Sequence, residues 1–487
     1  MKDENRALLF KKDVLVRLAK AFYNNDFEKG ANRLPVEMRP KDVDTVRCCV
    51  YKERAVARDR AIAGMGLSIE ESDDAIPLSE YAHEALQQEK PSDANLTVID
   101  IACNECVPSR YIVTEVCQGC LARSCADNCP FGAIYFENGR SKIDPTKCKN
   151  CGKCAMSCPY HAITKIVVPC EDVCPVGAIS KNEKGIAEID HDLCIRCGQC
   201  MKVCPFGAIT GKSQMIHALK AIAQGKKSVA MVAPSIAGQF NATLGQVATA
   251  LRLLGFTKVI EVAHGADVTT LNEAEELVER MEKGEKFMTT SCCPAYYQAA
   301  RRHIPDILPM VSSTGTPMHY TAEIIKKEDP QATTFFVGPC VAKRHEAMMD
   351  DLVDFVLTFE EIDALFTAKD INPSELDETD LGRDASKQGR GFPLSGGVAG
   401  AVQSIVGDKL EVKPVAINGL TAANMRILKA YAKNGAPGNL IEVMACPGGC
   451  SCGPAGCAGR VNEAVKGARK LMEESPDLNT FKDTVQK

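Results

Sequence analysis

Cysteine is concentrated in one part of this chain. Of the 25 cysteines in 487 residues, sixteen fall between Cys103 and Cys204, and the chain has no tryptophan. Scaffolds that use so much cysteine for disulfides are short and secreted. This chain is long enough for about three domains, and its first residues lack the apolar stretch of a signal peptide. We therefore expect the cysteines to be thiolate ligands in a reducing cytoplasm.

The overall composition excludes two classes of partner. Lysine and arginine number 58 and aspartate and glutamate 63, so the net charge is −5, which is too mild to indicate a nucleic-acid partner. No window approaches the 18 or more apolar residues of a membrane-spanning helix. We expect neither nucleic acid binding nor a membrane span.

The pattern of residues predicts three segments. Residues 1–95 are predicted to be a helical N-terminal segment with a linker, and residues 96–211 are cysteine-rich and repetitive. In residues 212–487, apolar β-branched runs alternate with helical patterns, which indicates an α/β module. The strands are expected in the runs SVAMVAP, KVIEVA, KFMTT, ATTFFVG and LIEVMA.

The cysteine-rich segment contains an internal repeat. The motif C-P-x-x-A-I begins at Cys129, Cys158, Cys174 and Cys204, and two of the intervals, AIYFENGRSKID and AISKNEKGIAEID, predict hairpins. Two cysteine runs, 148–158 and 194–204, have the form C-x2-C-x2-C-x3-C-P. This is the bacterial ferredoxin spacing, in which three cysteines hold one [4Fe–4S] cluster and the fourth ligates the neighbouring cluster.

This rule groups the sixteen cysteines into four [4Fe–4S] sites, arranged as two two-cluster units. The groups are Cys148, Cys151, Cys154 and Cys129; Cys117, Cys120, Cys125 and Cys158; Cys194, Cys197, Cys200 and Cys174; and Cys170, Cys204, Cys103 and Cys106. The second group has four residues between Cys120 and Cys125 instead of two. The fourth group includes Cys103 and Cys106, which lie outside the repeat. Structural zinc is the alternative, because C-x2-C pairs also bind zinc.

The α/β module has only seven cysteines, and most follow predicted strands. Cys292 and Cys293 follow KFMTT, Cys340 follows TTFFVGP, and Cys446 follows IEVMA with Cys450 four residues on. Ligands gather at strand ends in α/β sheets, and the glycines around Cys450 allow the backbone to approach a bulky group closely. The pattern indicates a further metal centre, with buried structural cysteines as the alternative.

Three motifs in this module resemble those of a known family. TSCCPAYY (290–297), GPCVAKRHEA (338–347) and EVMACPGGC (442–450) are similar to the three signature motifs of the [FeFe]-hydrogenases. The resemblance extends over the α/β module and the ferredoxin-like segment. It implies a two-lobed α/β catalytic module, preceded by α+β bacterial-ferredoxin-like domains and a helical segment. It also implies the reversible reduction of protons to H₂.

The resemblance also implies a ligand set. Cys293, Cys340, Cys446 and Cys450 would hold the [4Fe–4S] part of the H-cluster, and Cys450 would bridge to a two-iron subsite with CO, cyanide and azadithiolate. Cys292 would be a free thiol that passes protons, since neighbours tune a thiol pKa. The remaining matched residues are Lys343, which would donate to a cyanide, Glu346, and the pocket loop Ala233, Pro234 and Ser235.

A proton route is implied in the same way. Glu273 and Glu276 are three residues apart and share one face of a predicted helix. They match the family's two relay glutamates, and Ser312 matches its relay serine. The implied route runs from Glu276 through Ser312, Glu273 and a water to Cys292. The alternative is that the two glutamates belong to a solvated helix face.

The chain departs from the family pattern at several positions. Gly338 stands where most catalytic members have methionine, and Ala295-Tyr296 stands where Gly-Trp is usual. The third motif ends in SCGPAGC, which adds Cys452 and Cys457. These departures resemble the divergent group B branch. The roles of Cys452 and Cys457 are left open, and Cys48 and Cys49 are expected to be buried structural cysteines.

The implied partners are a ferredoxin-type electron carrier and the maturation proteins that insert the two-iron subsite. No G-x-G-x-x-G follows a predicted strand, so direct oxidation of NAD(P)H is not expected. Two other functions remain open. One is a hydrogen or redox sensor, although no segment resembles a signalling module, and the other is a non-catalytic relative that takes part in iron–sulfur cluster assembly.

Overall fold

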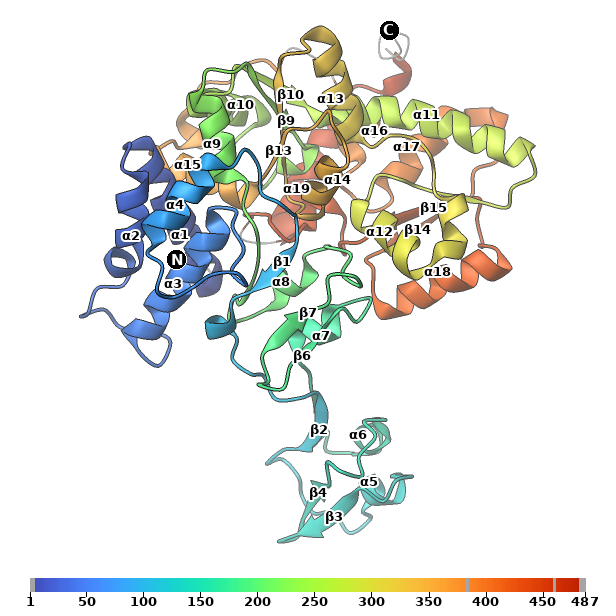
Figure 1. The fold of residues 1–487 in the computed structure, drawn as a ribbon. Helices are drawn as coiled ribbons and strands as arrows, with labels where there is room; N and C mark the ends of the chain where they lie inside the picture. The colour runs from blue at the N-terminus through green and yellow to red at the C-terminus, as the bar shows by residue number, and fades with distance from the viewer. Residues whose placement is uncertain (1–4, 382–384, 459–460, 481–487) are drawn as a thin grey trace.

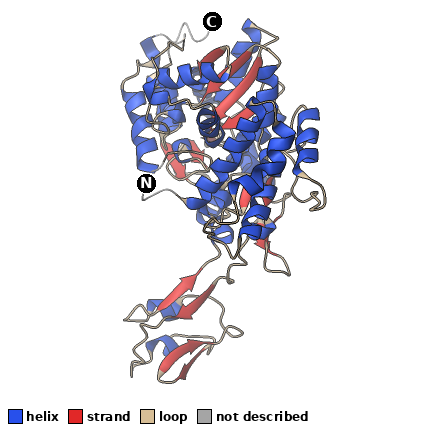
Figure 2. Ribbon diagram, turned by 90° about the vertical axis from the view of Figure 1, so that its left-hand side faces the viewer, coloured by secondary structure: helices blue, strands red, loops and turns tan. Residues whose placement is uncertain are grey.

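The computed structural model describes residues 5–381, 385–458 and 461–480. It consists of a large body of helices and sheets from which one small module projects (Figures 1 and 2). Within these residues, no helix is both long and apolar enough to cross a membrane.

Four helices form the N-terminal segment: α1 (Arg6–Tyr23), α2 (Phe27–Met38), α3 (Val50–Gly64) and α4 (Leu78–Gln87). Helix α1 buries Val14 and Leu18 completely and packs on α15 (Phe359–Ala368) of the body. An ion pair between Lys12 and Asp363, 2.7 Å apart, also joins the two helices. The segment is therefore part of the body.

The expectation for Cys48 and Cys49 is wrong. Both side chains are exposed in the loop before α3, with their Sγ atoms 3.7 Å apart. The loop does not carry them into the helical core, because the apolar side chains of α1 and α2 already fill it.

Both predicted hairpins are present in the ferredoxin-like region. They are β3 (Ile134–Glu137) with β4 (Arg140–Ile143), and β6 (Ile179–Lys181) with β7 (Ala187–Ile189). Two further antiparallel pairs join distant segments: β2 (Arg110–Val113) with β5 (Ile163–Ile166), and β1 (Leu96–Val98) with β8 (Ile209–Gly211). Short helices carry cysteines between them: α5 (Ser124–Asp127), α6 (Lys153–Met156), α7 (Pro169–Val173) and α8 (Gln199–Val203).

The two halves of this region sit differently. The half that contains β2 to β5 projects from the body, whereas the half with β6 and β7 lies against it (Figure 1). Arg302 in the body fastens the second half, because its guanidinium donates to the carbonyl oxygens of His191 and Cys194 at 2.8 and 3.1 Å. The ferredoxin-like hairpins are confirmed, but their unequal placement is not visible in the repeat.

The α/β module contains two parallel sheets. The four-stranded sheet has the order β10 (Lys258–Glu261), β9 (Ser228–Val232), β12 (Thr333–Gly338), β13 (Phe355–Thr358). The three-stranded sheet has the order β11 (Met288–Thr289), β15 (Leu440–Met444), β14 (Pro414–Asn418). Strands β9, β12, β13 and β15 are buried along their whole length, as expected for parallel strands with covered faces. The two-lobed α/β class is confirmed.

Helices cover both sheets: α9 (Met215–Ala223), α10 (Leu244–Leu254), α11 (Val262–Glu282), α12 (Pro294–His303), α13 (Pro317–Glu328), α14 (Ala342–Met348), α16 (Lys387–Gly391), α17 (Gly397–Val406), α18 (Ala422–Asn434) and α19 (Val461–Glu473). Helix α11 begins directly after β10, so the predicted strand KVIEVA is shorter than expected. A buried ion pair between Arg344 of α14 and Glu361 of α15, 2.7 Å apart, fixes α14 beside the end of β12.

Candidate metal centre

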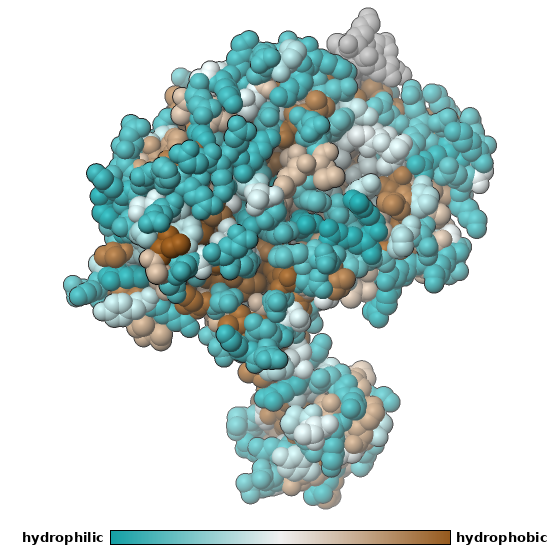
Figure 3. Space-filling view, in the orientation of Figure 1, coloured by the Kyte–Doolittle hydropathy of each residue, from teal (hydrophilic) through white to brown (hydrophobic). Residues whose placement is uncertain are grey.

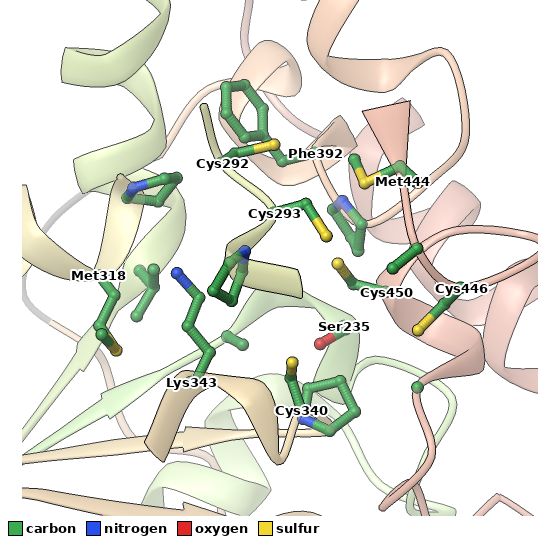
Figure 4. Close-up of a pocket in the computed structure, with 18 of the residues that line it drawn as sticks. Ser235, Cys292, Cys293, Met318, Cys340, Lys343, Phe392, Met444, Cys446 and Cys450 are labelled. Atoms are coloured by element: carbon green, nitrogen blue, oxygen red, sulfur yellow. The ribbon is translucent and has the colours of Figure 1, made fainter. Parts of the chain in front are cut away.

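A cavity lies where the ends of strands from both sheets meet. Cys292 and Cys293 reach it after β11, Cys340 after β12, and Cys446 and Cys450 after β15. In Figure 4 the sulfur atoms of Cys293 and Cys450 point toward each other across this cavity. All five cysteines of the three sequence motifs therefore line one space, although they come from three distant parts of the chain.

The cavity is suited to an iron–sulfur group. Its walls include the apolar side chains of Met318, Phe336, Phe392 and Met444. A structural zinc ion needs four ligands at about 2.3 Å from one centre, but no three His, Cys, Asp or Glu side chains in the described part of the chain lie close enough to hold a single metal ion. In a cubane each thiolate binds a different iron, so the sulfur atoms lie farther apart. The donor set therefore fits a cluster better than zinc.

Two polar side chains also reach this cavity. Lys343 enters from α14, and its ammonium lies 2.7 Å from Glu346 and 3.3 Å from Thr316. Burial disfavours the charged form of Lys343, but Glu346 outweighs it and raises the pKa. The Ser235 hydroxyl is buried and finds no hydrogen-bond partner in the described structure. Lys343 and Ser235 could therefore donate hydrogen bonds to an acceptor held between the cysteines. Ala233 and Pro234, which precede Ser235 in the chain, also line the cavity.

Glu346 does not line the cavity. Its carboxylate binds Lys343 and also accepts a short hydrogen bond from Thr316, which precedes α13. The residue thus orients the lysine from behind.

Glu276 on α11 lies in a dense hydrogen-bond network. Ser312 donates to it at 2.6 Å, Ser313 and Thr314 donate at 3.0 and 2.9 Å, and Arg280 lies 2.7 Å away. Burial works against the carboxylate, but these hydrogen bonds outweigh it and lower the pKa of Glu276 to about 2. Glu276 is therefore an anion at neutral pH.

Glu273 lies one helical turn earlier and is fully buried. One of its carboxylate oxygens accepts from the backbone and hydroxyl of Ser291, at 3.0 and 3.2 Å. The other oxygen has no partner among residues 5–381, 385–458 and 461–480. Burial raises the pKa of Glu273 to about 7. This helix face is thus not solvated, and its two carboxyl groups favour opposite protonation states.

Ser291 was not anticipated. It is the residue before Cys292, so its hydrogen bonds place Glu273 next to the cavity-lining thiol. Its position within the motif TSCC was the available signal.

Several accessory cysteines lie together in two apolar clusters, each of which contains members of two predicted groups. Cys125, Cys154 and Cys158 share an apolar cluster in the projecting module. In the second half, one apolar cluster contains Cys170 together with the partly buried Cys103, Cys106, Cys174 and Cys200. In all four repeats the alanine N–H donates to the sulfur of the cysteine four residues earlier, at distances from 3.2 to 3.4 Å.

The second ferredoxin-like half touches the cavity. Cys197 lines it, and the side-chain amide of Gln199 on α8 donates to the sulfur of Cys446 at 3.3 Å. Gln199 is buried and lies between two predicted cluster ligands. This connection was also missed, since nothing in the spacing distinguishes Gln199 from other residues between cysteines.

The two additional cysteines of the third motif do not line the cavity. Cys452 is buried, and a Cβ on Gly448 would lie 2.7 Å from its sulfur. The thiol of Cys457 lies 3.6 Å from the carbonyl oxygen of Gln239.

Comparison with known families agrees with this geometry. Residues 226–454 match the model of the iron only hydrogenase large subunit, C-terminal domain. The chain carries an iron-only hydrogenase domain. Residues 141–164 and 187–210 match a 4Fe-4S binding domain, which supports iron–sulfur clusters in the cysteine-rich region.

The relatives are distant. Iron hydrogenase 1 of Clostridium pasteurianum is 29% identical over 68% of this chain and 67% of its own length. The periplasmic [Fe] hydrogenase large subunit of Nitratidesulfovibrio vulgaris is 29% identical over 48% of this chain and 70% of its own. A cytosolic Fe-S cluster assembly factor of Xenopus tropicalis is 25% identical over 50% of this chain and 63% of its own length. The hydrogenase domain is thus divergent, and the relatives of the chain include both hydrogenases and assembly factors.

Among solved structures, a variant of the [FeFe]-hydrogenase HydA1 from Chlamydomonas reinhardtii is similar to this chain. The match covers 56% of this chain and 94% of the chain in that structure. The TM-score is 0.44 and the sequence identity 21%.

The buried carboxyl of Glu273 makes a stability prediction. Its pKa is about 7 in the fold and 4.5 as a free side chain, so the folded state binds more protons between these values and loses stability as the pH rises through them. Glu273→Gln removes this loss. Its stability relative to the unsubstituted protein should rise by about 2 kcal/mol between pH 5.5 and 8, measured by thermal unfolding of protein without the two-iron subsite.

Glu275→Gln is the matched control, because Glu275 is exposed on the same helix. The raised pKa would be contradicted if the difference in stability between Glu273→Gln and the unsubstituted protein did not change with pH and equalled the difference for the control.

Proposed function

We propose that the chain is a hydrogenase that catalyses 2H⁺ + 2e⁻ ⇌ H₂ at an H-cluster. The observation that carries the proposal is the convergence of five cysteines and Lys343 on one buried cavity with an acid beside it. We take residues 1–95, 96–211 and 212–487 as its helical, iron–sulfur and catalytic domains.

In this proposal, Cys293, Cys340, Cys446 and Cys450 would hold a [4Fe–4S] cluster, and Cys450 would also help to hold the two-iron subsite. When bound, that subsite supplies the metal at which protons and electrons combine. The ammonium of Lys343 and the unpaired hydroxyl of Ser235 are donors for its cyanide ligands, and the apolar walls exclude water. Glu346 holds the Lys343 ammonium in place.

Protons would move along residues of α11 and the motif that follows β11. Glu276 would carry a proton only transiently at the outer end, because its pKa is low, and the Ser312 hydroxyl would hand the proton inward. Glu273 would pass the proton from its unpartnered oxygen through a water to the Cys292 thiol. Its pKa of about 7 allows it to gain and lose a proton near neutral pH. Ser291 holds Glu273 in position for this transfer.

Electrons would travel through four accessory [4Fe–4S] clusters held by the sixteen cysteines. The proximal cluster is that of Cys174, Cys194, Cys197 and Cys200, since Cys197 lines the cavity. A ferredoxin-type carrier would exchange electrons with the far end of this wire. We further propose that maturation proteins insert the two-iron subsite and that the protein acts in the cytoplasm.

An assembly function without the two-iron subsite is the second candidate, because several relatives are named as cytosolic Fe-S cluster assembly factors. Such a protein needs only the four cluster cysteines. The lining of the cavity by Cys292, Lys343 and an unpaired Ser235 hydroxyl favours the hydrogenase, since ligation of a [4Fe–4S] cluster alone does not require a fifth thiol or these two donors.

Infrared spectroscopy separates the two candidates. Protein matured anaerobically with the two-iron precursor should give bands of metal-bound CO and cyanide. Protein with the [4Fe–4S] clusters alone is the control and should lack them. Absence of these bands after maturation, with all clusters present, would refute the hydrogenase proposal.

The proton route predicts the effect of one substitution on turnover. Glu273→Gln should reduce H₂ evolution by roughly 10²-fold or more, because general acid–base transfer contributes about 10²–10⁴-fold. The CO and cyanide bands should remain unchanged, since Glu273 is not a ligand. Equal activity in Glu273→Gln and Glu275→Gln would contradict the route.

The contact from Gln199 predicts a change in redox potential. An N–H donated to a cluster ligand stabilises the reduced, more negative cluster. Gln199→Leu should therefore lower the midpoint potential of the cluster held by Cys446 by roughly 40 mV, as expected for a hydrogen bond worth about 1 kcal/mol. Redox titration followed by electron paramagnetic resonance measures this shift in protein without the two-iron subsite. Gln199→Glu, which keeps the size but loses the amide donor, should also lower it.

A further inference from the structure

The projecting module differs from the body in charge. Residues 107–167 contain eight lysines and arginines and four aspartates and glutamates, whereas the whole chain has a net charge of −5. The module is therefore basic and the rest of the chain acidic. Bound clusters add negative charge below the surface of both parts, so the contrast between their surfaces remains.

The far end of this module holds two predicted cluster ligands. The turn between β3 and β4 lies farthest from the body in both ribbon views (Figures 1 and 2). The loop of Cys117 and Cys120 lies directly on this turn, because a Cβ on Gly119 would lie 2.0 Å from the carbonyl oxygen of Gly139. We call the loop 117–123 together with the hairpin 134–143 the tip.

The tip carries apolar side chains that the described part of the chain leaves exposed. Leu121 is 99% exposed and directly follows Cys120, and Tyr135 on β3 is 49% exposed. Leu121 belongs to the four-residue interval between Cys120 and Cys125, which is two residues longer than the one between Cys151 and Cys154. The module is also marked by apolar patches in the space-filling view (Figure 3). An isolated leucine on a surface is common, but this one adjoins a predicted cluster ligand.

The tip has three basic residues and one acidic residue, Glu137, which lies opposite Arg140 in the hairpin. Lys142 is exposed directly across the hairpin from Tyr135, and Arg140 precedes it by two residues. Arg140 lies 2.7 Å from Glu115, but Glu115 is 97% exposed, so this ion pair is weak and leaves the guanidinium available. Arg123 stacks on the ring of Phe136 at 4.2 Å, which fixes the loop against the hairpin.

We propose that the tip is the docking surface for a small acidic iron–sulfur electron carrier. An apolar centre with a charged rim is typical of transient protein interfaces, in which the rim charges speed association. Positive charge at the tip favours an acidic partner and repels basic ones. The partner would come close to the cluster of Cys117 and Cys120, where the proposed wire begins. This inference rests on the proposed electron-transfer function.

The test measures binding of an acidic bacterial ferredoxin to the full chain with its [4Fe–4S] clusters but without the two-iron subsite. The double substitution Arg140→Glu and Lys142→Glu should weaken binding about tenfold at low salt. It should also reduce the dependence of the dissociation constant on salt. Leu121→Asn should weaken binding about fivefold at any salt concentration, because it removes an apolar contact.

Matched controls lie on the body. Lys327→Glu with Lys470→Glu makes the same change in net charge at side chains that are 71% and 77% exposed. Leu253→Asn replaces a leucine that is half-exposed on α10. Neither control should change binding by more than about twofold.

Two outcomes would overturn the proposal. The first is equal weakening by the tip variants and the body controls. The second is self-association of the unsubstituted chain that the tip variants abolish, seen by sedimentation velocity, which would make the tip a contact between two copies. Binding is measured without the two-iron subsite, so the two proposals can fail separately. If the infrared bands are absent but the carrier still binds at the tip, the hydrogenase proposal is refuted and the docking surface is supported.

Discussion

The molecule depends on the meeting of two parallel sheets at the carboxyl ends of their strands. Such edges collect loops, and in this chain the loops after β11, β12 and β15 each bring cysteine to one cavity. A thiol buried alone is disfavoured as a thiolate, and burial raises the pKa of Cys450 and Cys340. A metal group that receives the thiolates would remove this penalty on the charged form. The way in which the two sheets meet therefore brings together thiols that an iron–sulfur group could use as ligands.

The departures from the family motifs are compensated nearby. A Cβ on Gly338 would lie 2.4 Å from the ring of Phe336, which itself lines the cavity. The phenylalanine thus occupies space that a side chain at position 338 would need, two residues away on the same strand. Tyr296 is fully buried and donates to Thr289 at 2.8 Å, so its hydroxyl is satisfied where an indole is usual. Side chains that differ from the family pattern therefore fill the space at and behind this part of the cavity wall.

Much of this site was predictable, because the cysteines follow predicted strands and the resemblance of the three motifs implies a role for Lys343. Sequence reasoning placed the hairpins from the repeat, and from the alternation of apolar runs and helical patterns it placed five of the seven strands described in the α/β module. It did not name β13 and β14, and β10 is shorter than expected. It missed Ser291 and Gln199, since their roles arise from segments that pack together only in the fold. It was wrong for Cys48 and Cys49, because a cysteine-rich composition does not tell which loops reach the core. The sequence also did not predict that one half of the ferredoxin-like region projects from the body. That difference depends on contacts formed only in the fold, such as those of Arg302 with the other half.

Two chains of contacts reach the cavity from different elements. One runs along α11 through Glu273 and Ser291 to the segment of Cys292, and its members are carboxyl and hydroxyl groups. The other comes from the ferredoxin-like half through Cys197 and Gln199 to Cys446, and its members are sulfur and an amide. The first group exchanges protons readily, whereas the second holds no acid between its predicted cluster ligands. Because they share no residue, a substitution in one should leave the other intact. Under the proposed function, proton supply and electron supply could then be altered separately, and they would be coupled only within the cavity itself.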